Sequence, residues 1–223
     1  MLKLIQAVRE GELNTRGNTA AYDGAWSELV AGMNGLMEAV AEPMDEFRAV
    51  LDRLSLNDIT VKMEKEYSGV WNDIKNGVNS FIRIITHVQD TVIHISNGDL
   101  SDLEIDKKIG RRCENDQLMP AMIRMMEAIQ SLFDDAVMLT GSAMAGKLDV
   151  RADVTRHKGI YRRIIEEFNG TLDALTGPLN MAAEYVDRIS KGDIPPKITD
   201  SYNGDFNEIK NNLNTCIDSV NRV

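Results

Sequence analysis

Two histidines at helical spacing are the first residues of this sequence whose side chains suit chemistry. His87 and His94 lie seven residues apart, which places both on one face of a helix. Such a pair of imidazoles can respond to pH near neutrality or share a metal ion with a second chain. No carboxylate or cysteine repeats that spacing, so we expect flanking surface histidines and no metal site.

Nucleophiles and paired acids are equally sparse. The sequence has no phosphate-binding glycine loop and no nucleophile elbow. Its two cysteines, Cys113 and Cys216, are far apart in the sequence, which indicates free thiols in a reducing compartment. Glu166 and Glu167 are adjacent acids that methylation could modify, although an exposed helix face explains them equally well. We therefore expect no enzyme and no bound cofactor.

The composition is that of an acidic, helix-rich chain of 223 residues. The formal net charge of −10 disfavours a phosphate backbone, so we expect no nucleic-acid partner. Aromatic residues make up only 5% of the chain and prolines are few, which favours helices over a β-sandwich. Because no run of about 18 apolar residues is present, we expect no membrane contact within this chain. We expect a cytoplasmic location, within a parent protein that membrane helices elsewhere could anchor.

A block of thirteen residues occurs four times, beginning at Tyr22, Tyr67, His157 and Tyr202. Each copy has glycine at the third position, an aromatic residue at the fifth and an apolar residue followed by asparagine at the end. We expect the tyrosines to hold the preceding connector, and His157 to pack in the same place. The closing asparagines are either signalling contacts or hydrogen-bonding residues at the flank of a bundle: Asn34, Asn79, Asn169 and Asn214.

A second motif precedes each block and consists of Gly or Asn, a polar residue, and Leu or Ile. The Leu or Ile falls at positions 13, 59, 100, 148 and 194, so the motif recurs at intervals of 46, 41, 48 and 46 residues. The third copy of the block is degenerate, with Leu118 at the aromatic position and Met126 in place of the asparagine. The predicted connector-turn residues are Gly11, Leu13, Ile59, Gly98, Leu100, Gly146, Leu148, Gly192 and Ile194. This period predicts five units, at residues 1–40, 41–86, 87–131, 132–176 and 177–223.

A narrow apolar seam runs along the predicted helices. From Trp71 onward apolar residues recur with alternating steps of three and four, the heptad pattern of a coiled coil. The segments after Trp26 and Tyr161 contain two successive steps of four, near Pro43 and Pro178, which rotates the seam. The pattern predicts helices over about 22–55, 67–96, 115–144, 158–190 and 204–223, with a short helical piece at the N-terminus. The expected dimer-core seam comprises Trp26, Met33, Trp71, Ile74, Val78, Phe81, Ile85, Leu118, Met125, Tyr161, Ile164, Phe168, Phe206, Ile209 and Leu213.

The connectors between these helices predict how the helices are arranged. Each contains a few apolar residues, which favours packing on a bundle over a free linker. A connector of ten extended residues reaches about 33 Å, longer than a helix of about 24 Å, so it can start the next helix from the same end. Two parallel helices with narrow apolar seams do not close a core by themselves. A homodimer supplies the two further helices that complete a four-helix bundle. The predicted fold is all-α, with parallel homodimeric four-helix coiled-coil bundles stacked end to end and continuous helices shared between successive units.

These motifs resemble the HAMP domain. The resemblance rests on the Gly-Asp-Leu type of turn, the connector with two apolar positions and the second helix that ends in an apolar residue followed by Asn. Pro43 and Pro178 match the proline that often opens the first helix of that domain, and Asp116 to Leu118 resembles the usual start of its second helix. Repeated along nearly the whole chain, the pattern looks like a poly-HAMP array, as in bacterial chemoreceptors (methyl-accepting chemotaxis proteins) and hybrid histidine kinases.

The resemblance implies a signal-relay module that carries a conformational change from a sensor to an output domain, in chemoreceptor signalling or histidine-kinase control. Its implied partners are a second copy of the chain and the upstream sensor and downstream signalling domains of the same polypeptide. Two alternatives stay open. One is a passive structural coiled-coil spacer, and the other is a sensory bundle that binds a ligand or cofactor. The methionine-rich segment from Leu118 to Ala128 suits either a soft core or such a pocket.

Overall fold

In the computed structural model, residues 2–222 are described, and that part of the chain contains helices and no strand. The chain divides into two compact units, residues 1–99 and 100–223. The first unit contains α1 (Leu2–Glu10), the 3-10 turn η1 (Thr19–Ala21), α2 (Ala25–Leu54) and α3 (Val70–Ser96). The second contains α4 (Leu103–Ile109), α5 (Leu118–Met144), the 3-10 turn η2 (Val154–Arg156), α6 (Gly159–Ser190) and α7 (Gly204–Val220). The predicted all-α class is therefore confirmed.

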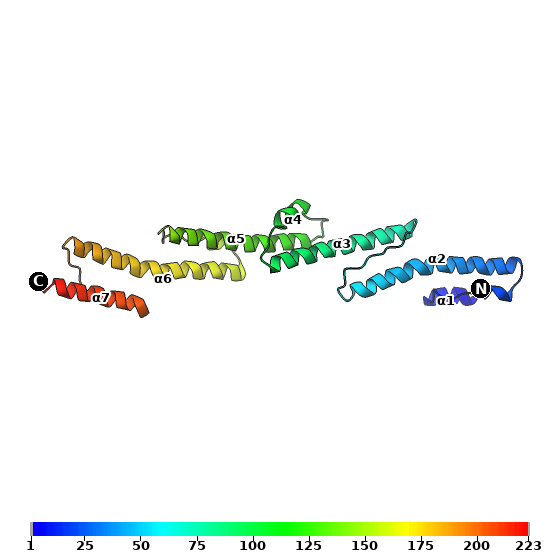
Figure 1. Cartoon of the computed structure of the whole chain (residues 1–223), viewed down its shortest axis with the longest axis horizontal. Helices are drawn as coiled ribbons and strands as arrows, with labels where there is room; N and C mark the ends of the chain where they lie inside the picture. The colour runs from blue at the N-terminus through cyan, green and yellow to red at the C-terminus, as the bar shows by residue number, and fades with distance from the viewer. Residues whose placement is uncertain (1, 223) are drawn as a thin grey trace. The chain divides into compact units, whose positions relative to one another are not determined.

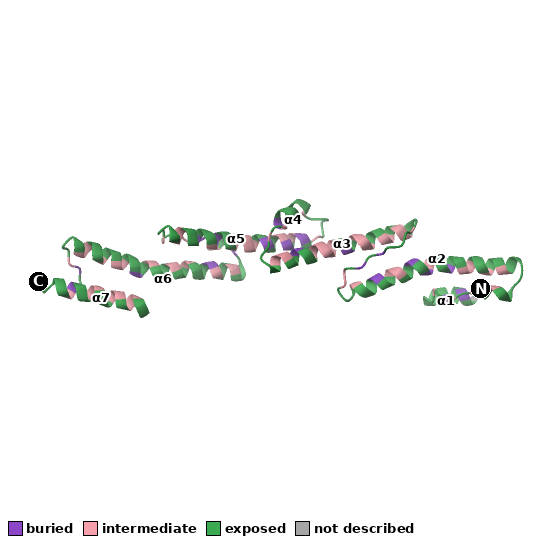
Figure 2. Ribbon diagram, viewed as in Figure 1, coloured by how far each residue is buried: buried purple, intermediate pink, exposed green. Residues whose placement is uncertain are grey.

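The two helices of a repeat run in the same direction within the first unit. After α2 the connector runs back along that helix, so that α3 points in the same direction as α2 (Figure 1). The core between them consists of Val50 from α2, Val61 and Met63 from the connector, and Ile82 from α3. Figure 2 shows buried positions on α2, on the connector and on α3. The apolar connector residues therefore pack into the bundle, as their pattern predicts.

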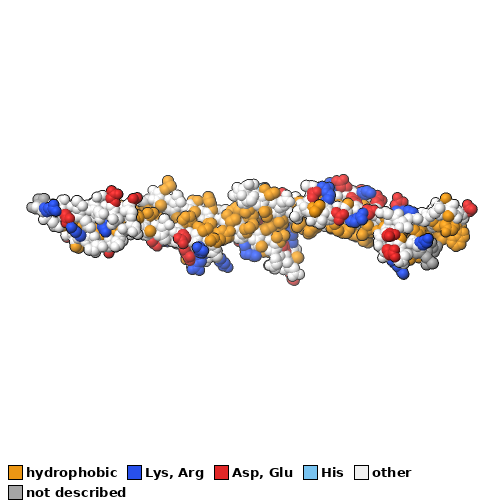
Figure 3. All heavy atoms as spheres, turned by 90° about the horizontal axis from the view of Figure 1, so that it is seen from below, with side chains coloured by type: hydrophobic (Ala, Val, Ile, Leu, Met, Phe, Trp, Pro, Cys, Tyr) orange, Lys and Arg blue, Asp and Glu red, His pale blue; other side chains and the backbone are white. Residues whose placement is uncertain are grey.

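The second unit repeats this arrangement with other residues. Leu139 of α5, Ala152 of the connector and Ile165 of α6 form its core. The next connector buries Ile198, and α7 buries Ile217. Hydrophobic side chains also gather on the visible outer surface over α5 and α6 (Figure 3).

One expectation about the helices agrees with the structure and another is corrected. Helices α2 and α6 continue through Pro43 and Pro178, as the predicted ranges 22–55 and 158–190 require. A proline removes one backbone hydrogen bond, but tertiary packing holds the rest of such a long helix. The connector of the third repeat, however, is not extended throughout, because it folds into α4, which buries Leu103 and leaves Ile105 exposed.

Candidate functional site

Each predicted connector begins with the same left-handed turn at a helix C-terminus. At Gly98 (φ 77°) the N–H of Asp99 donates to the carbonyl of His94 at 2.9 Å, which is a Schellman motif. Gly11, Gly146 and Gly192 share the positive φ and the equivalent bonds. Asn57 takes the same place with φ 61°, and asparagine tolerates this conformation better than other non-glycine residues. All five predicted turns are therefore present.

Four asparagines hold the connectors by a two-point clamp. Asn79 Oδ1 accepts a hydrogen bond from the N–H of Met63 at 2.9 Å, and its Nδ2 donates to the carbonyl of Met63 at 2.9 Å. The same pair of bonds joins Asn34 to Gly17, Asn169 to Ala152 and Asn214 to Ile198. All four closing asparagines thus make hydrogen bonds to a connector of their own chain.

The clamp lets an extended connector enter the apolar core. Met63 is only 1% exposed, so its backbone N–H and carbonyl need partners inside the protein. A carboxamide offers one donor and one acceptor side by side, and a single asparagine therefore satisfies both groups. The clamp fixes which connector residue faces the second helix of each repeat.

A second polar contact closes the end of the connector. The hydroxyl of Tyr67 donates to Glu46 Oε2 at 2.5 Å, and the backbone N–H groups of Glu64 and Lys65 donate to Glu46 Oε1. Burial and the hydrogen bond to Glu46 raise the pKa of Tyr67. Burial alone would raise the pKa of Glu46, but its hydrogen bonds from Tyr67 and the two backbone groups lower it overall. We call this contact the latch.

The second unit builds its latch from different chemistry. His157 Nε2 lies 2.5 Å from Asp135 Oδ2, and both side chains are buried. Arg156 Nη1 adds an ion pair to Asp135 Oδ1 at 3.0 Å. His157 thus occupies the place of Tyr67, as its position in the block predicts. The acids Glu46 and Asp135 were missed, although each precedes the start of the block by a similar distance, which is a signal that comparison of the repeats could have revealed.

Comparison with known families decides what these repeated features mean. A family model described as the HAMP domain matches residues 21–87 and 156–222, which together make up more than half of the chain. The chain belongs to the HAMP domain family. HAMP domains are signal-relay modules of sensor proteins, and two separate matches agree with a poly-HAMP array. No solved structure matches the chain at a significant level.

Each HAMP match begins at a thirteen-residue block and contains a second one, and the glycine of the block has a defined backbone role. Gly69, before α3, has φ 60° and ψ −138°, and Gly24, before α2, has nearly the same angles. Gly159 and Gly204 also have positive φ at the starts of α6 and α7. Side chains other than hydrogen are strained in this region of the backbone map, which explains the glycine at the third position.

Two glycine substitutions in the same helix are expected to have opposite effects. Gly69→Ala should lower the free energy of unfolding of the first unit by about 1–3 kcal/mol, because alanine is strained at this φ. Gly77→Ala, inside α3 with no atom within 4 Å of the added Cβ, should raise it by about 0.5–1 kcal/mol. Both tryptophans lie in the first unit, so urea unfolding followed by tryptophan fluorescence measures both variants. If both substitutions changed the free energy of unfolding in the same direction, the explanation from backbone strain at Gly69 would be wrong.

Two acids that hold the connector between α2 and α3 make the first HAMP-matched segment sensitive to low pH: Glu46 of α2 and Asp58 of the connector itself. Hydrogen bonds from the side chain and backbone of Thr60, and then Arg53, lower the pKa of Asp58 from 3.8 to about 2. The pKa of Glu46 is also lowered from its ordinary 4.5. A lowered folded-state pKa means that the unfolded state binds protons first, so stability is full above about pH 5 and is lost as the pH falls toward about 2.

We expect the stability of the Glu46→Gln variant to fall less than that of the wild type as the pH is lowered from about 5 to about 2. Glutamine keeps an acceptor for Tyr67 but has no proton to gain between about pH 5 and pH 2. The measurement is the midpoint of thermal unfolding at steps across this range, by tryptophan fluorescence. Asp52→Asn is the control, because Asp52 is an exposed acid of α2 whose carboxylate makes no hydrogen bond or ion pair within residues 2–222. An acid dependence identical in the wild type and the Glu46 variant would exclude Glu46 as its source.

The third repeat keeps the left-handed turn at Gly98 but departs from the others in its clamp, its connector and the start of its second helix. Met126 replaces the clamp asparagine and is fully buried, so no carboxamide is available to satisfy an extended connector. The connector satisfies its own backbone groups by forming α4, which is the physical reason for the extra helix. The start of α5 is also different, because Asp116 Oδ1 accepts hydrogen bonds from the N–H groups of Leu118 and Met119. This side-chain cap replaces the glycine start.

None of the fifteen predicted seam residues is buried within the chain. Trp26 is 65% exposed and Phe81 is 54% exposed, and Leu118, Met125 and Phe168 are also exposed. The other ten are half-buried. The core of the single chain instead uses neighbouring positions, such as Ile82 beside Phe81 and Ile165 beside Ile164. Within each unit some seam residues therefore stay exposed in the single chain, whereas Ile74 and Val78 pack against the core of the first unit.

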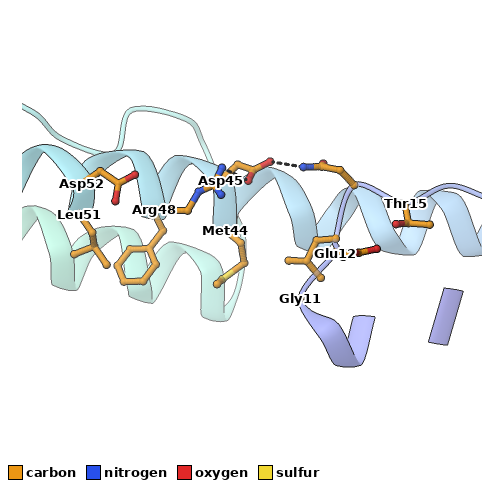
Figure 4. A pocket seen from close by; sticks show the side chains of 11 residues that line it. Gly11, Glu12, Thr15, Met44, Asp45, Arg48, Leu51 and Asp52 are labelled. Carbon is orange, nitrogen blue, oxygen red and sulfur yellow. Dashed lines mark hydrogen bonds and ion pairs between the residues drawn. The ribbon is translucent and has the colours of Figure 1, made fainter. Parts of the chain in front are cut away.

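A cavity of about 630 Å³ lies against α2 in the first unit, and it illustrates how a connector turn meets a helix (Figure 4). Gly11 to Thr15 form one wall, and Met44, Phe47 and Leu51 of α2 form an apolar wall. A hydrogen bond of 3.4 Å from Asn14 to Asp45 joins the two walls. The turn residues Gly11 and Leu13 are therefore placed beside the helix, as predicted for a connector turn.

The residues first considered for chemistry lie outside these contacts. His87 and His94 are half-buried on α3, and Cys113 and Cys216 are exposed free thiols. Over residues 2–222, no group of three or more His, Cys, Asp or Glu side chains is placed to hold a metal ion. Within the same range, no helix is both long and apolar enough to cross a membrane.

Proposed function

We propose that this chain is a poly-HAMP signal relay that works as a parallel homodimer. Its five units are proposed at residues 1–40, 41–86, 87–131, 132–176 and 177–223. A conformational change enters from a sensor domain upstream in the same polypeptide and leaves toward a signalling domain downstream. We place it in a chemoreceptor or a hybrid histidine kinase, on the cytoplasmic side, because these are the settings that the family resemblance implies.

The unburied seam is the observation that carries the proposal. Each repeat supplies two parallel helices with a small core on one side and an exposed apolar stripe on the other. A second copy supplies two more parallel helices, which completes a four-helix bundle. The apolar hollow of about 290 Å³ lined by Leu139, Phe168 and Leu172 lies on this stripe, where the partner's side chains would fill it.

The relay itself would use the continuous helices. Helices α2, α3, α5 and α6 each pass through a proposed unit boundary, so a rotation in one bundle is carried into the next. The stutters give successive bundles different seam phases, and neighbouring bundles that favour different packings are bistable elements. The clamps and latches keep each connector attached to its helices during such a change.

The two alternatives predict less of what is observed. A passive coiled-coil spacer needs heptads, but it needs neither the five left-handed turns nor the four clamps. A ligand-binding sensory bundle needs a polar or aromatic cavity in one unit, but it does not need exposed apolar seam residues on the helices of both units. The relay accounts for the turns, the clamps and the exposed seam together.

Insertions into α3 test the relay in a receptor in which the chain links a sensor to a kinase. One residue inserted after Gln89 rotates the downstream seam by about 100°, whereas seven residues restore its phase. We expect the single insertion to lock or abolish the response of kinase autophosphorylation to the sensor, and the seven-residue insertion to preserve it. An unchanged response with the single insertion would show that helix phase carries no signal.

A further inference from the structure

A basic cavity lies between α5 and the start of α6 in the second unit, on the flank that bears the latch. Its volume is about 680 Å³. Its lining residues are Arg124, Glu127, Ala128 and Ser131 of α5, and the continuous run from Arg156 to Tyr161. It is separate from the apolar hollow on the seam, with which it shares no lining residue.

Three cations from different elements border this cavity. Arg156 is held over α5 by Asp135 at 3.0 Å and Ser131 at 3.4 Å. The side chains of Arg124 and Lys158 are exposed, and neither is bonded to another residue within the described range 2–222. The one carboxylate among the lining residues is Glu127, whose charge is offset by Lys107 at 3.3 Å. The cavity therefore has a net positive charge in a chain whose formal charge is −10.

The equivalent place in the first unit shows that the fold does not require these cations. The repeats align on the turn residues Gly146 and Asn57, and on the helix-start residues Gly159 and Gly69. The residues in place of Arg124, Ser131, Arg156 and Lys158 are then Gly35, Glu42, Glu66 and Ser68. In the first unit the acids at these places are paired with Lys65 and Lys75, whereas the second unit has cations there, although both units have the clamp and the latch.

We propose that this cavity binds a small anion that carries a phosphate group. Guanidinium groups match phosphate oxygens in a two-point geometry, and Lys158 adds a compact positive charge. The first turn of α6 lines the same cavity and favours negative charge at its N-terminus. Ile160 offers an apolar surface for an organic part of the ligand. The bound anion would join α5 to the start of α6 beside the latch, so the array would have a chemical input of its own.

Pyrophosphate is the probe for this site, with isothermal titration calorimetry on the full chain. The double variant Arg124→Gln, Lys158→Gln removes the two cations that have no structural bonds. The control Arg9→Gln, Lys62→Gln removes the same charge at exposed positions of the first unit. We expect one saturable site per chain, bound about tenfold more weakly or worse by the double variant and equally by the control.

Three results would overturn the proposal. These are no saturable binding to the wild-type chain, an affinity unchanged in the double variant, and an equal loss in both double variants, which would indicate a general charge effect. Circular dichroism checks that the helices persist. If the double variant loses helix, Arg124→Gln alone, at an exposed position of α5, gives the same comparison. Binding is measured without any signalling output, so this result is independent of the relay.

Discussion

Replacing Asn79 by alanine is expected to lower the free energy of unfolding of the first unit by about 2–4 kcal/mol. The substitution leaves the N–H and the carbonyl of Met63 without their partner, and Met63 is only 1% exposed. Each buried group without a hydrogen bond costs about 1–3 kcal/mol, which is more than the net value of the bond itself. Urea unfolding followed by tryptophan fluorescence measures the change, since Trp26 and Trp71 both lie in this unit.

Asn76→Ala on the same helix is the matched control. Asn76 is exposed one turn before Asn79. We expect this change to alter stability by no more than about 0.5 kcal/mol. If both alanine variants unfold at the same urea concentration, the clamp has no energetic role and the account of the connector is wrong.

Replacing Phe81 by aspartate is expected to convert the proposed dimer to a monomer. Phe81 is 54% exposed in the single chain, so the change should spare the fold of the protomer. In the proposed bundle it would place an unpaired carboxylate of each chain inside an apolar core, at a cost of about 3–5 kcal/mol or more. This corresponds to a dissociation constant raised about 100-fold or more. Sedimentation equilibrium measures the change, and circular dichroism checks the helices.

Asn76→Asp introduces the same acid on the opposite side of α3 from the seam. This variant should sediment as a dimer with an unchanged dissociation constant. A dimer that survives Phe81→Asp would show that the two chains meet through another surface. A wild-type chain that is monomeric at all concentrations would remove the basis of the relay.

Much of the fold is present in the spacing of a few residue types. Glycine or asparagine before a polar residue and Leu or Ile predicted five helix ends, and all five left-handed turns are observed. The heptad steps predicted long helices, and α2, α3, α5 and α6 match them within a few residues. Both features depend on residues that are close together in the sequence. A turn with positive φ requires glycine or asparagine at one position, and a helix that buries one face has apolar residues every three or four positions.

The features that were missed depend on residues far apart in the sequence. Glu46 and Asp135 are ordinary exposed-helix acids by pattern, and only the folded connector brings Tyr67 or His157 to them. The helix α4 was also missed, because its cause is the loss of one asparagine at Met126.

Disulfide crosslinking on the seam tests the parallel dimer most directly. The design replaces Cys113 and Cys216 by serine and places a single cysteine at Val78, which packs at the edge of the core on the seam side of α3. A cysteine at Asp73, on the opposite face, is the control. The account predicts rapid oxidation of the Val78→Cys chain to a covalent dimer, and little crosslinking at Asp73→Cys. A Val78→Cys chain that stays monomeric on oxidation, or crosslinks no faster than the control, would contradict a parallel, in-register dimer and with it the relay.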